Sequence, residues 1–175
     1  MKLLILSTIS FVVFLLYCRK NNNRSCKIIS FHEDILTIKI SSPKSFIQIV
    51  KKYGIGKDGF YNNSINEIIN ESIPESGVYE INFKKQLINL NEEEQCNKIP
   101  YDWKICHPVI LACAILEYKR EKGKILMDKW QSRTSLSRGN YSLVLNYSSS
   151  GLSWYYLSKS ATSSFLGLVM SRKIS

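Results

Sequence analysis

The chain begins with a hydrophobic run. This run constrains where the remaining residues can fold, because a chain that keeps a membrane segment must fold its body beside a lipid surface. Residues 3–18 read LLILSTISFVVFLLYC and are interrupted only by Ser7, Thr8 and Ser10. As a helix the run would span about 24 Å, at ~1.5 Å per residue. A bilayer core is about 30 Å thick, whereas a signal-peptide core is shorter. The length of the run therefore fits either an anchor or a signal peptide.

The residues around Cys18 favour an anchor that is retained. Signal peptidase requires small residues at the last and third-last positions before the cut. Only a cut after Cys18 comes near this pattern, and it leaves Leu16 at the third-last position with Arg19 and Lys20 directly behind it. A lipoprotein acylated at Cys18 is a second alternative, although Tyr17 stands where a small residue is usual.

We predict a signal-anchor over residues 1–20 and a single ectodomain over residues 21–175. The anchor would place large apolar side chains in lipid, among them Leu3, Phe11, Val12, Phe14 and Leu16. Basic side chains that can reach the lipid headgroups follow at Arg19, Lys20, Arg24 and Lys27. The positive-inside rule then favours a cytosolic body, whereas the cysteines and glycosylation sequons of the body favour the opposite side.

The net charge of +10 is concentrated in the second half of the chain. Residues 19–97 hold eleven Lys or Arg and ten Asp or Glu, whereas residues 98–175 hold twelve and four. A basic half of this kind fits a solvated face, an anionic membrane surface or an acidic protein partner. The sequence shows no helix-turn-helix, zinc-finger or RNA-recognition pattern, so nucleic acid is not an expected partner.

Four cysteines follow the hydrophobic run, at Cys26, Cys96, Cys106 and Cys113. They allow three pairings, and the sequence does not distinguish among them. We favour Cys96–Cys106, which closes a short loop, together with Cys26–Cys113, which ties the first strand to the core. Free buried thiols in a reducing compartment are the alternative. Because no C-x-x-C spacing occurs, no metal site is expected.

Asn-x-Ser sequons provide candidate glycosylation sites in the body at Asn62, Asn70, Asn140 and Asn146. In the strand expected over residues 141–148, Asn146 shares its side with Ser142 and Val144, whereas Leu143 and Leu145 lie on the other side. Glycans on this strand would therefore point away from the apolar face. Unused sequons are the alternative.

Alternation of apolar and polar residues predicts several strands. Leu36, Ile38 and Ile40 alternate with polar residues after a short strand and a turn. Tyr79, Ile81 and Phe83 alternate with polar residues in the same way. The tail of the chain predicts three further strands, over residues 141–148, 152–159 and 165–172.

Two segments carry helix signals. The stretch SPKSFIQIVKKYG predicts a helix with Ser42 as N-cap and Gly54 as its stop. A short helix is expected around residues 65–69. The stretch HPVILACAILEYKREKG fits a helix from Pro108 to a stop at Gly123, with a buried hairpin as the alternative. Together the elements predict an α+β fold, with a mainly antiparallel sheet and two or three helices behind the anchor.

The sequence contains no evident catalytic constellation. Cys106 and His107, with Asp102 nearby, come closest to a thiol nucleophile, but adjacent residues seldom bring sulfur and imidazole within hydrogen-bond reach. We expect His107 to cap the following helix instead. The sequence therefore predicts no catalytic residue, no cofactor and no small-molecule substrate, and a secreted thiol hydrolase remains a minor alternative.

Aromatic side chains are candidates for partner contacts, because Trp and Tyr are enriched at the centres of protein interfaces. The candidates are Trp103, Trp154 and Tyr155. Strand alternation separates Trp154 from Tyr155, so at least one of these two is expected in the core.

The hydrophobic run followed at once by Arg19 and Lys20 resembles the sorting anchor of occlusion-derived-virus envelope proteins from baculoviruses and nudiviruses. The stretch YDWKICHPVILAC, beside a Tyr-rich tail, is similar to the per os infectivity factors, of the factor four type. The resemblance implies a non-enzymatic member of the per os infectivity complex, through which virions enter insect midgut cells. It implies membrane lipid and other envelope proteins of that complex as partners, and no catalytic residue.

We therefore expect a membrane-anchored viral envelope protein that acts through protein–protein contacts and reaches the virion by way of a host membrane. The alternative is a small secreted or periplasmic binding protein, such as an immunity lipoprotein. The two expectations differ in whether the hydrophobic run stays attached as a protein anchor.

Overall fold

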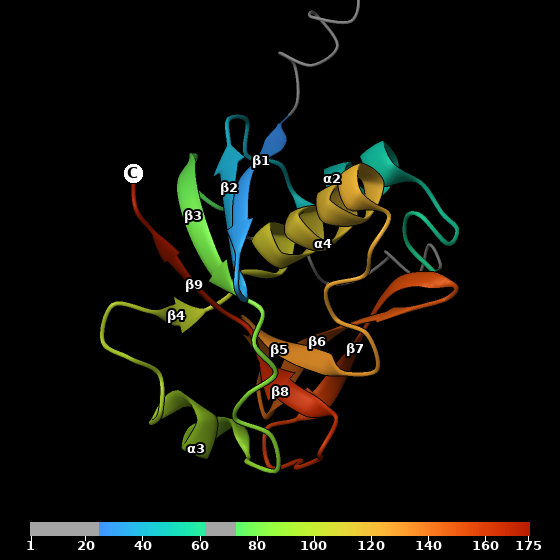
Figure 1. The fold of residues 1–175 in the computed structure, drawn as a ribbon. Coiled ribbons are helices and arrows are strands. Elements are labelled where there is room, and N and C mark those ends of the chain that lie inside the picture. Colours follow the sequence, from blue (N-terminus) through green and yellow to red (C-terminus); the bar gives the residue numbers. More distant parts are fainter. Residues whose placement is uncertain (1–24, 62–72) are drawn as a thin grey trace, which may run out of the picture.

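The computed structural model of the chain describes residues 25–61 and 73–175. The described residues form three helices and nine strands, in two mainly antiparallel sheets (Figure 1). The α+β class and the mainly antiparallel pairing are confirmed, although the sequence predicted one sheet rather than two. The predicted anchor and the short helix expected around residues 65–69 lie outside the described residues. No helix within the described ranges is long and apolar enough to cross a membrane.

The first sheet has five strands in the order β1-β2-β3-β9-β4, and all of its pairs are antiparallel. Its strands are β1 (Cys26–His32), β2 (Ile35–Ile40), β3 (Gly77–Asn82), β4 (Lys104–Ile105) and β9 (Met170–Lys173). The predicted alternation holds, because Leu36, Ile38 and Ile81 are fully buried. A tight turn that contains Glu33 joins β1 to β2.

The second sheet has four strands in the order β7-β6-β5-β8. Its strands are β5 (Gln131–Arg138), β6 (Tyr141–Ser148), β7 (Gly151–Ser158) and β8 (Leu166–Leu168). The neighbours β5, β6 and β7 are antiparallel, whereas β8 runs parallel to β5. The strands predicted over residues 141–148 and 152–159 correspond to β6 and β7, but β5 was not predicted.

The tail strand predicted over residues 165–172 is wrong as a single element. The structure divides it into β8 and β9, which belong to different sheets. Val169 lies between the two: its N–H donates to Ser132 Oγ over 2.8 Å, and its carbonyl accepts from the Cys106 N–H over 3.0 Å. The chain therefore passes from the second sheet to the first at Val169. The alternation of apolar and polar residues in the sequence cannot predict such a change of sheet.

Helix α2 (Phe46–Tyr53) begins later than predicted, because Ser45 and not Ser42 is its N-cap. The Ser45 hydroxyl accepts from the Gln48 N–H, and the Gln48 side chain accepts from the Ser45 N–H, which is a capping box. The predicted stop at Gly54 is confirmed, since the helix ends there with φ at 73°.

Helix α4 (Pro108–Lys122) confirms the helical interpretation of its sequence over the hairpin. His107 is its N-cap, and Gly123 ends it in the left-handed region that glycine adopts without strain. The third helix, α3 (Glu92–Cys96), was not predicted; Asn91 and Glu94 cap its N-terminus reciprocally.

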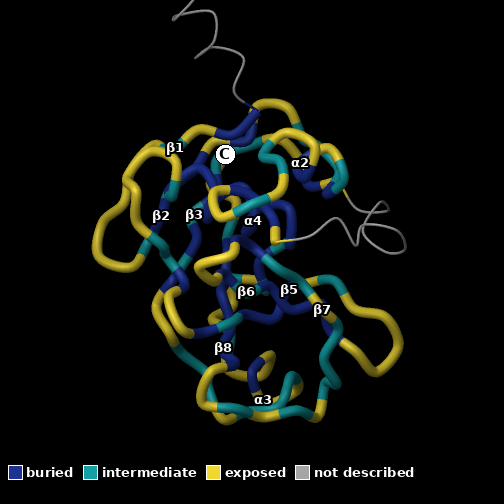
Figure 2. Tube along the Cα trace, turned by 90° about the vertical axis from the view of Figure 1, so that its right-hand side faces the viewer, coloured by how far each residue is buried: buried dark blue, intermediate teal, exposed yellow. Residues whose placement is uncertain are grey.

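Helix α4 forms the centre of the core and is buried on all sides from Pro108 to Tyr118. It contacts β1 and β2 of the first sheet and β5 and β6 of the second, and Figure 2 shows buried chain along this junction. A second junction joins α2 to β7, where Phe46, Phe60 and Trp154 pack edge to face with ring centroids 5.2–5.5 Å apart. One continuous hydrophobic cluster therefore joins both sheets.

The other face of the second sheet is also covered, by α3, which lies on the side away from α4 (Figure 1). Arg133 of β5 stands opposite Val144 of β6 and hydrogen-bonds Gln95 of α3. Ser142 and Val144 were expected on an exposed side of their strand, but both are fully buried. That expectation is wrong because a second, smaller layer packs on this face of the sheet.

Candidate functional site

The turn between β5 and β6 shapes the candidate site. Arg138 and Tyr141 pair across the last rung of the two strands, so only Gly139 and Asn140 form the loop. Gly139 has φ of 55°, a value that a side chain would strain. The tight loop therefore fixes Arg138 and Tyr141 side by side at the end of the second sheet.

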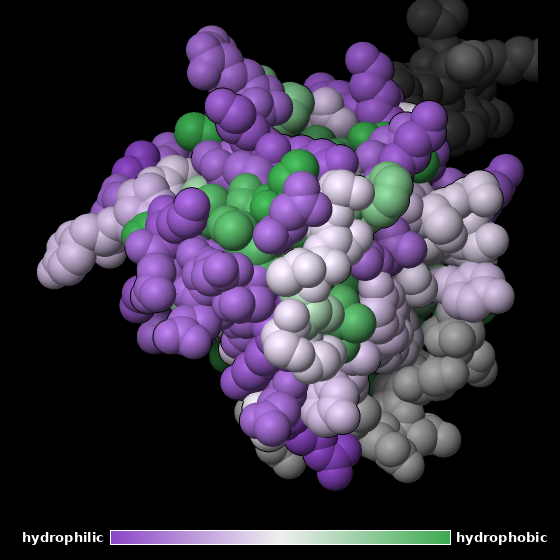
Figure 3. Space-filling view, turned by 90° about the horizontal axis from the view of Figure 1, so that it is seen from below, coloured by the Kyte–Doolittle hydropathy of each residue, from purple (hydrophilic) through white to green (hydrophobic). Residues whose placement is uncertain are grey.

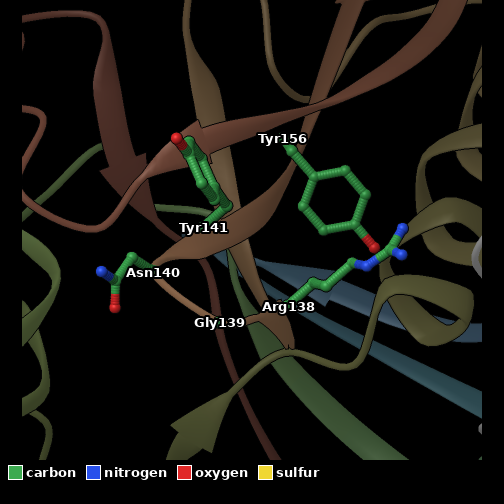
Figure 4. A pocket seen from close by; sticks show the side chains of 5 residues that line it. All are labelled: Arg138, Gly139, Asn140, Tyr141 and Tyr156. Atoms are coloured by element: carbon green, nitrogen blue, oxygen red, sulfur yellow. The ribbon is translucent and has the colours of Figure 1, made fainter.

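Tyr156 of β7 completes the site. It lies opposite Leu143 of β6, two residues from Tyr141, so the two tyrosines stand on the same face of the sheet. Together with Arg138, Gly139 and Asn140 they line an open hollow of about 560 Å³. In Figure 4 the Tyr156 hydroxyl lies close to the Arg138 guanidinium.

The hollow combines a cation with aromatic surface. Burial raises the pKa of Tyr156, and the positive charge of Arg138 opposes that rise. Among the described residues no carboxylate forms an ion pair with Arg138, and 54% of the Tyr141 surface is exposed. A planar guanidinium next to a tyrosine hydroxyl, with a second exposed tyrosine on the same hollow, can bind the carboxylate of an acidic side chain and bury its apolar stem. The arrangement is therefore suited to a protein contact.

The three aromatic residues predicted as partner contacts do not come together. Trp154 belongs to the core, where it packs against Phe46 and Phe60. Tyr155 lies on the opposite face of β7, where its hydroxyl donates to the Gln131 side chain. Trp103 lies far from Trp154 and Tyr155 in the sequence. The Arg172 guanidinium stacks over its ring, 4.8 Å from the ring centroid.

Sequence reasoning missed the hollow for a specific reason. Tyr141 and Tyr156 are visible as a same-face pair once the register of β6 and β7 is known. Arg138 lies on β5, a strand without apolar alternation. The stretch RGNY, in which a basic and an aromatic residue flank a Gly-Asn turn, was the available signal.

All four cysteines of the described residues are free thiols in the structure. Cys26 and Cys113 are both buried, and interaction with Cys113 is the largest cause that raises the pKa of the Cys26 thiol. Cys106 is fully buried, whereas Cys96 is exposed beside Glu92. The predicted pair Cys26–Cys113 is thus brought together, and the predicted bonds themselves stay predictions.

His107 and Cys106 lie directly before helix α4. The His107 Nδ1 accepts a hydrogen bond from the Val109 N–H over 3.2 Å, which is the predicted cap. Burial raises the pKa of the Cys106 thiol to about 12 and lowers the pKa of His107 to about 4. Asp102 forms an ion pair with Arg172. These pKa directions disfavour a thiolate–imidazolium pair at this position.

We expect His107 to make the folded chain less stable as the pH falls. Its pKa is about 4 in the folded chain and 6.5 in the unfolded chain, so the unfolded chain binds the proton first. The stabilisation is complete above pH 6.5, and between pH 7 and pH 5 about 1–2 kcal/mol should be lost. Urea unfolding at the two pH values measures the loss. His107→Asn, which replaces the Nδ1 acceptor of the cap by an amide oxygen that cannot titrate, should remove it, and an unchanged pH slope in that variant would contradict the assignment.

The glycosylation candidates differ in exposure. Asn140 is exposed in the β5–β6 turn, whereas Asn146 is half-buried and lines a second hollow, of about 350 Å³, with Trp130 and Phe165. Asn62 and Asn70 lie outside the described residues. Asn140 is therefore the better placed of the two described candidates.

The face beyond α3 is mainly hydrophilic, and its hydrophobic side chains form small separate groups among polar ones (Figure 3). Within residues 25–61 and 73–175, no three His, Cys, Asp or Glu side chains cluster as a metal site. Lys27 is exposed at the start of β1, and the other basic-flank residues lie outside the described ranges.

Comparison of the chain with protein families, with curated proteins and with solved structures finds no match in any of the three.

Proposed function

We propose that this chain is a membrane-anchored protein of a viral envelope, of the per os infectivity factor kind, which acts without catalysis by contacting other envelope proteins. Residues 1–20 hold it in lipid, and the folded body makes the contacts. The support for the anchor is the apolar run of residues 3–18 with Arg19 and Lys20 directly behind it.

The observation that carries the contact function is the hollow of Arg138, Tyr141 and Tyr156. Arg and Tyr are the residue types that contribute most at protein interfaces. Here the tight β5–β6 turn holds the backbones of Arg138 and Tyr141 in place, so the loop itself loses little conformational freedom on binding. The positive charge of Arg138 favours a partner with an acidic side chain at the centre of its contact.

Photocrosslinking from position 141 tests the contact. Replacement of Tyr141 by p-benzoylphenylalanine, in membranes or virions that carry the chain with its natural partners, should give one crosslinked product of higher mass. Adding Arg138→Ala should lower its yield about tenfold or more, because loss of a central arginine commonly costs at least ~1.4 kcal/mol of binding.

Tyr61 provides a matched control, because Tyr61 and Tyr141 are both 54% exposed. The same crosslinker at position 61 should give no discrete product. Equal yields from positions 61 and 141, or a yield from position 141 that Arg138→Ala leaves unchanged, would contradict the proposed contact surface.

A further inference from the structure

Two buried cysteines from distant parts of the chain meet in the core. Cys26 opens β1 and is 0% exposed, and Cys113 lies within α4 and is 2% exposed. The two thiols lie close enough to interact, and this interaction is the largest cause of the raised pKa of Cys26. Helix α4 packs directly on β1, so the backbones that carry the two thiols are held side by side (Figure 1).

The other described cysteines occupy different surroundings. Cys106 is buried at the start of α4, and its thiol lies beside Ser171 and the His107 carbonyl. Cys96 lies in α3, near Glu92 and Lys159 on the far side of the second sheet. Neither meets the thiol pair, so among the described cysteines Cys26 and Cys113 are partners for each other alone.

An ionic cluster centred on the buried Glu117 lies beside the pair. Glu117, one turn along α4 from Cys113, is fully buried; it accepts from Lys52 Nζ over 3.0 Å, from Arg120 and from the Tyr53 hydroxyl. The interaction with Cys113 raises the pKa of Cys26, and burial and the charge of Glu117 raise it further, while Lys52 opposes them. A thiol of high pKa is a poor leaving group, so a disulfide that contains it is cleaved slowly by other thiols. A bond formed here during folding would therefore persist.

We propose that Cys26 and Cys113 are joined by a structural disulfide in the mature protein. The two thiols lose two protons and two electrons as the S–S bond forms, and a protein or glutathione disulfide of the oxidising compartment is reduced to two thiols. The bond fastens β1, which begins at Cys26 shortly after the proposed anchor, to the central helix α4. A force that pulls on the anchor of residues 1–20 would then be transmitted to the core through a covalent bond. The inference rests on the proposed function in one respect, namely that a viral envelope protein with its body on the outer side of the membrane folds in an oxidising compartment.

A non-reducing peptide map of the full-length chain tests the bond. The chain is expressed with its leader in insect cells, denatured in N-ethylmaleimide and digested without reductant. The expected result is one crosslinked peptide pair that contains Cys26 and Cys113 and separates on reduction. Recovery of Cys26 and Cys113 as alkylated single peptides would overturn the proposal, as would either residue crosslinked to Cys96 or Cys106.

Thermal unfolding provides a second readout. Reduction should lower the unfolding midpoint by about 5–10 °C, because it frees a long loop in the unfolded chain. Cys26→Ser and Cys113→Ser should each abolish this reductant-dependent shift, and the control Cys96→Ser should leave it intact. Loss of the shift in the Cys96 variant would show a different pairing. A membrane-held chain with free thiols would overturn only the bond, whereas a bonded chain that is freely soluble would overturn only the anchor.

Discussion

Replacing Arg133 with alanine should lower the free energy of unfolding by about 3–5 kcal/mol. Arg133 is the largest fully buried side chain among the described residues. Its guanidinium donates to Gln95 Oε1 and to the Ala161 carbonyl, each over 2.6 Å, and it lies 3.9 Å from a Glu92 carboxylate oxygen. Truncation leaves the buried Gln95 oxygen and the partly buried Ala161 carbonyl without their donor and opens a cavity beneath α3.

Arg138→Ala provides the matched control, because Arg138 lies on the same strand but is exposed. It should change the free energy of unfolding by no more than about 0.5 kcal/mol. Urea unfolding of both full-length variants in mild detergent, followed by tryptophan fluorescence, measures the difference. An Arg133→Ala loss below about 1 kcal/mol would show that α3 and its neighbouring loops do not depend on this side chain.

The same buried arginine explains why part of the fold could not be predicted. The strand β5 reads QSRTSLSR, and its buried positions are Ser132, Arg133 and Thr134. Their polar groups are satisfied by hydrogen bonds, such as Thr134 Oγ1 to the Leu143 carbonyl over 3.0 Å. Hydropathy alternation cannot detect a buried strand whose burial depends on partners elsewhere in the chain.

Elements that depend on local signals were predictable. β2 and β3 alternate cleanly, and α4 carries a proline at its start and a glycine at its end. The Ser42-Pro43 pair predicts too early a start for α2, because the capping box of Ser45 and Gln48 defines the start of the helix. Elements defined by long-range pairing, such as the parallel β8 and the two-residue β4, have no local signature.

The candidate site shows the same division. Sequence reasoning identified aromatic residues of the tail as contact candidates, but the elements that pack on each part of the sheet decide which are available. Trp154 faces the aromatic core, whereas Tyr156 faces Arg138 in the hollow. The hollow needs three strands in register, and that information is tertiary.

Removing residues 1–20 should transfer the chain completely from the membrane fraction to the soluble fraction. An inserted apolar helix is held in lipid almost irreversibly. The basic half of the body offers a weaker attraction, about 1 kcal/mol per Lys or Arg near an anionic surface, which salt screens. Extraction with alkaline carbonate removes proteins held by charge and leaves inserted ones, so it distinguishes the two kinds of attachment.

Arg19→Ala combined with Lys20→Ala provides the control for the basic flank. The apolar run is unchanged in this variant, so the chain should remain carbonate-resistant while its sorting or orientation changes. Release of this variant by carbonate would assign the attachment to charge and not to the hydrophobic run.

The most direct measurement is the amino-terminal sequence of the chain that stays with membranes after carbonate extraction. The account predicts that this chain still contains residues 3–18 as unmodified protein and that little of the chain is released. A chain that starts at Arg19, a chain that starts at a lipid-modified Cys18, or full recovery in the soluble fraction would contradict it.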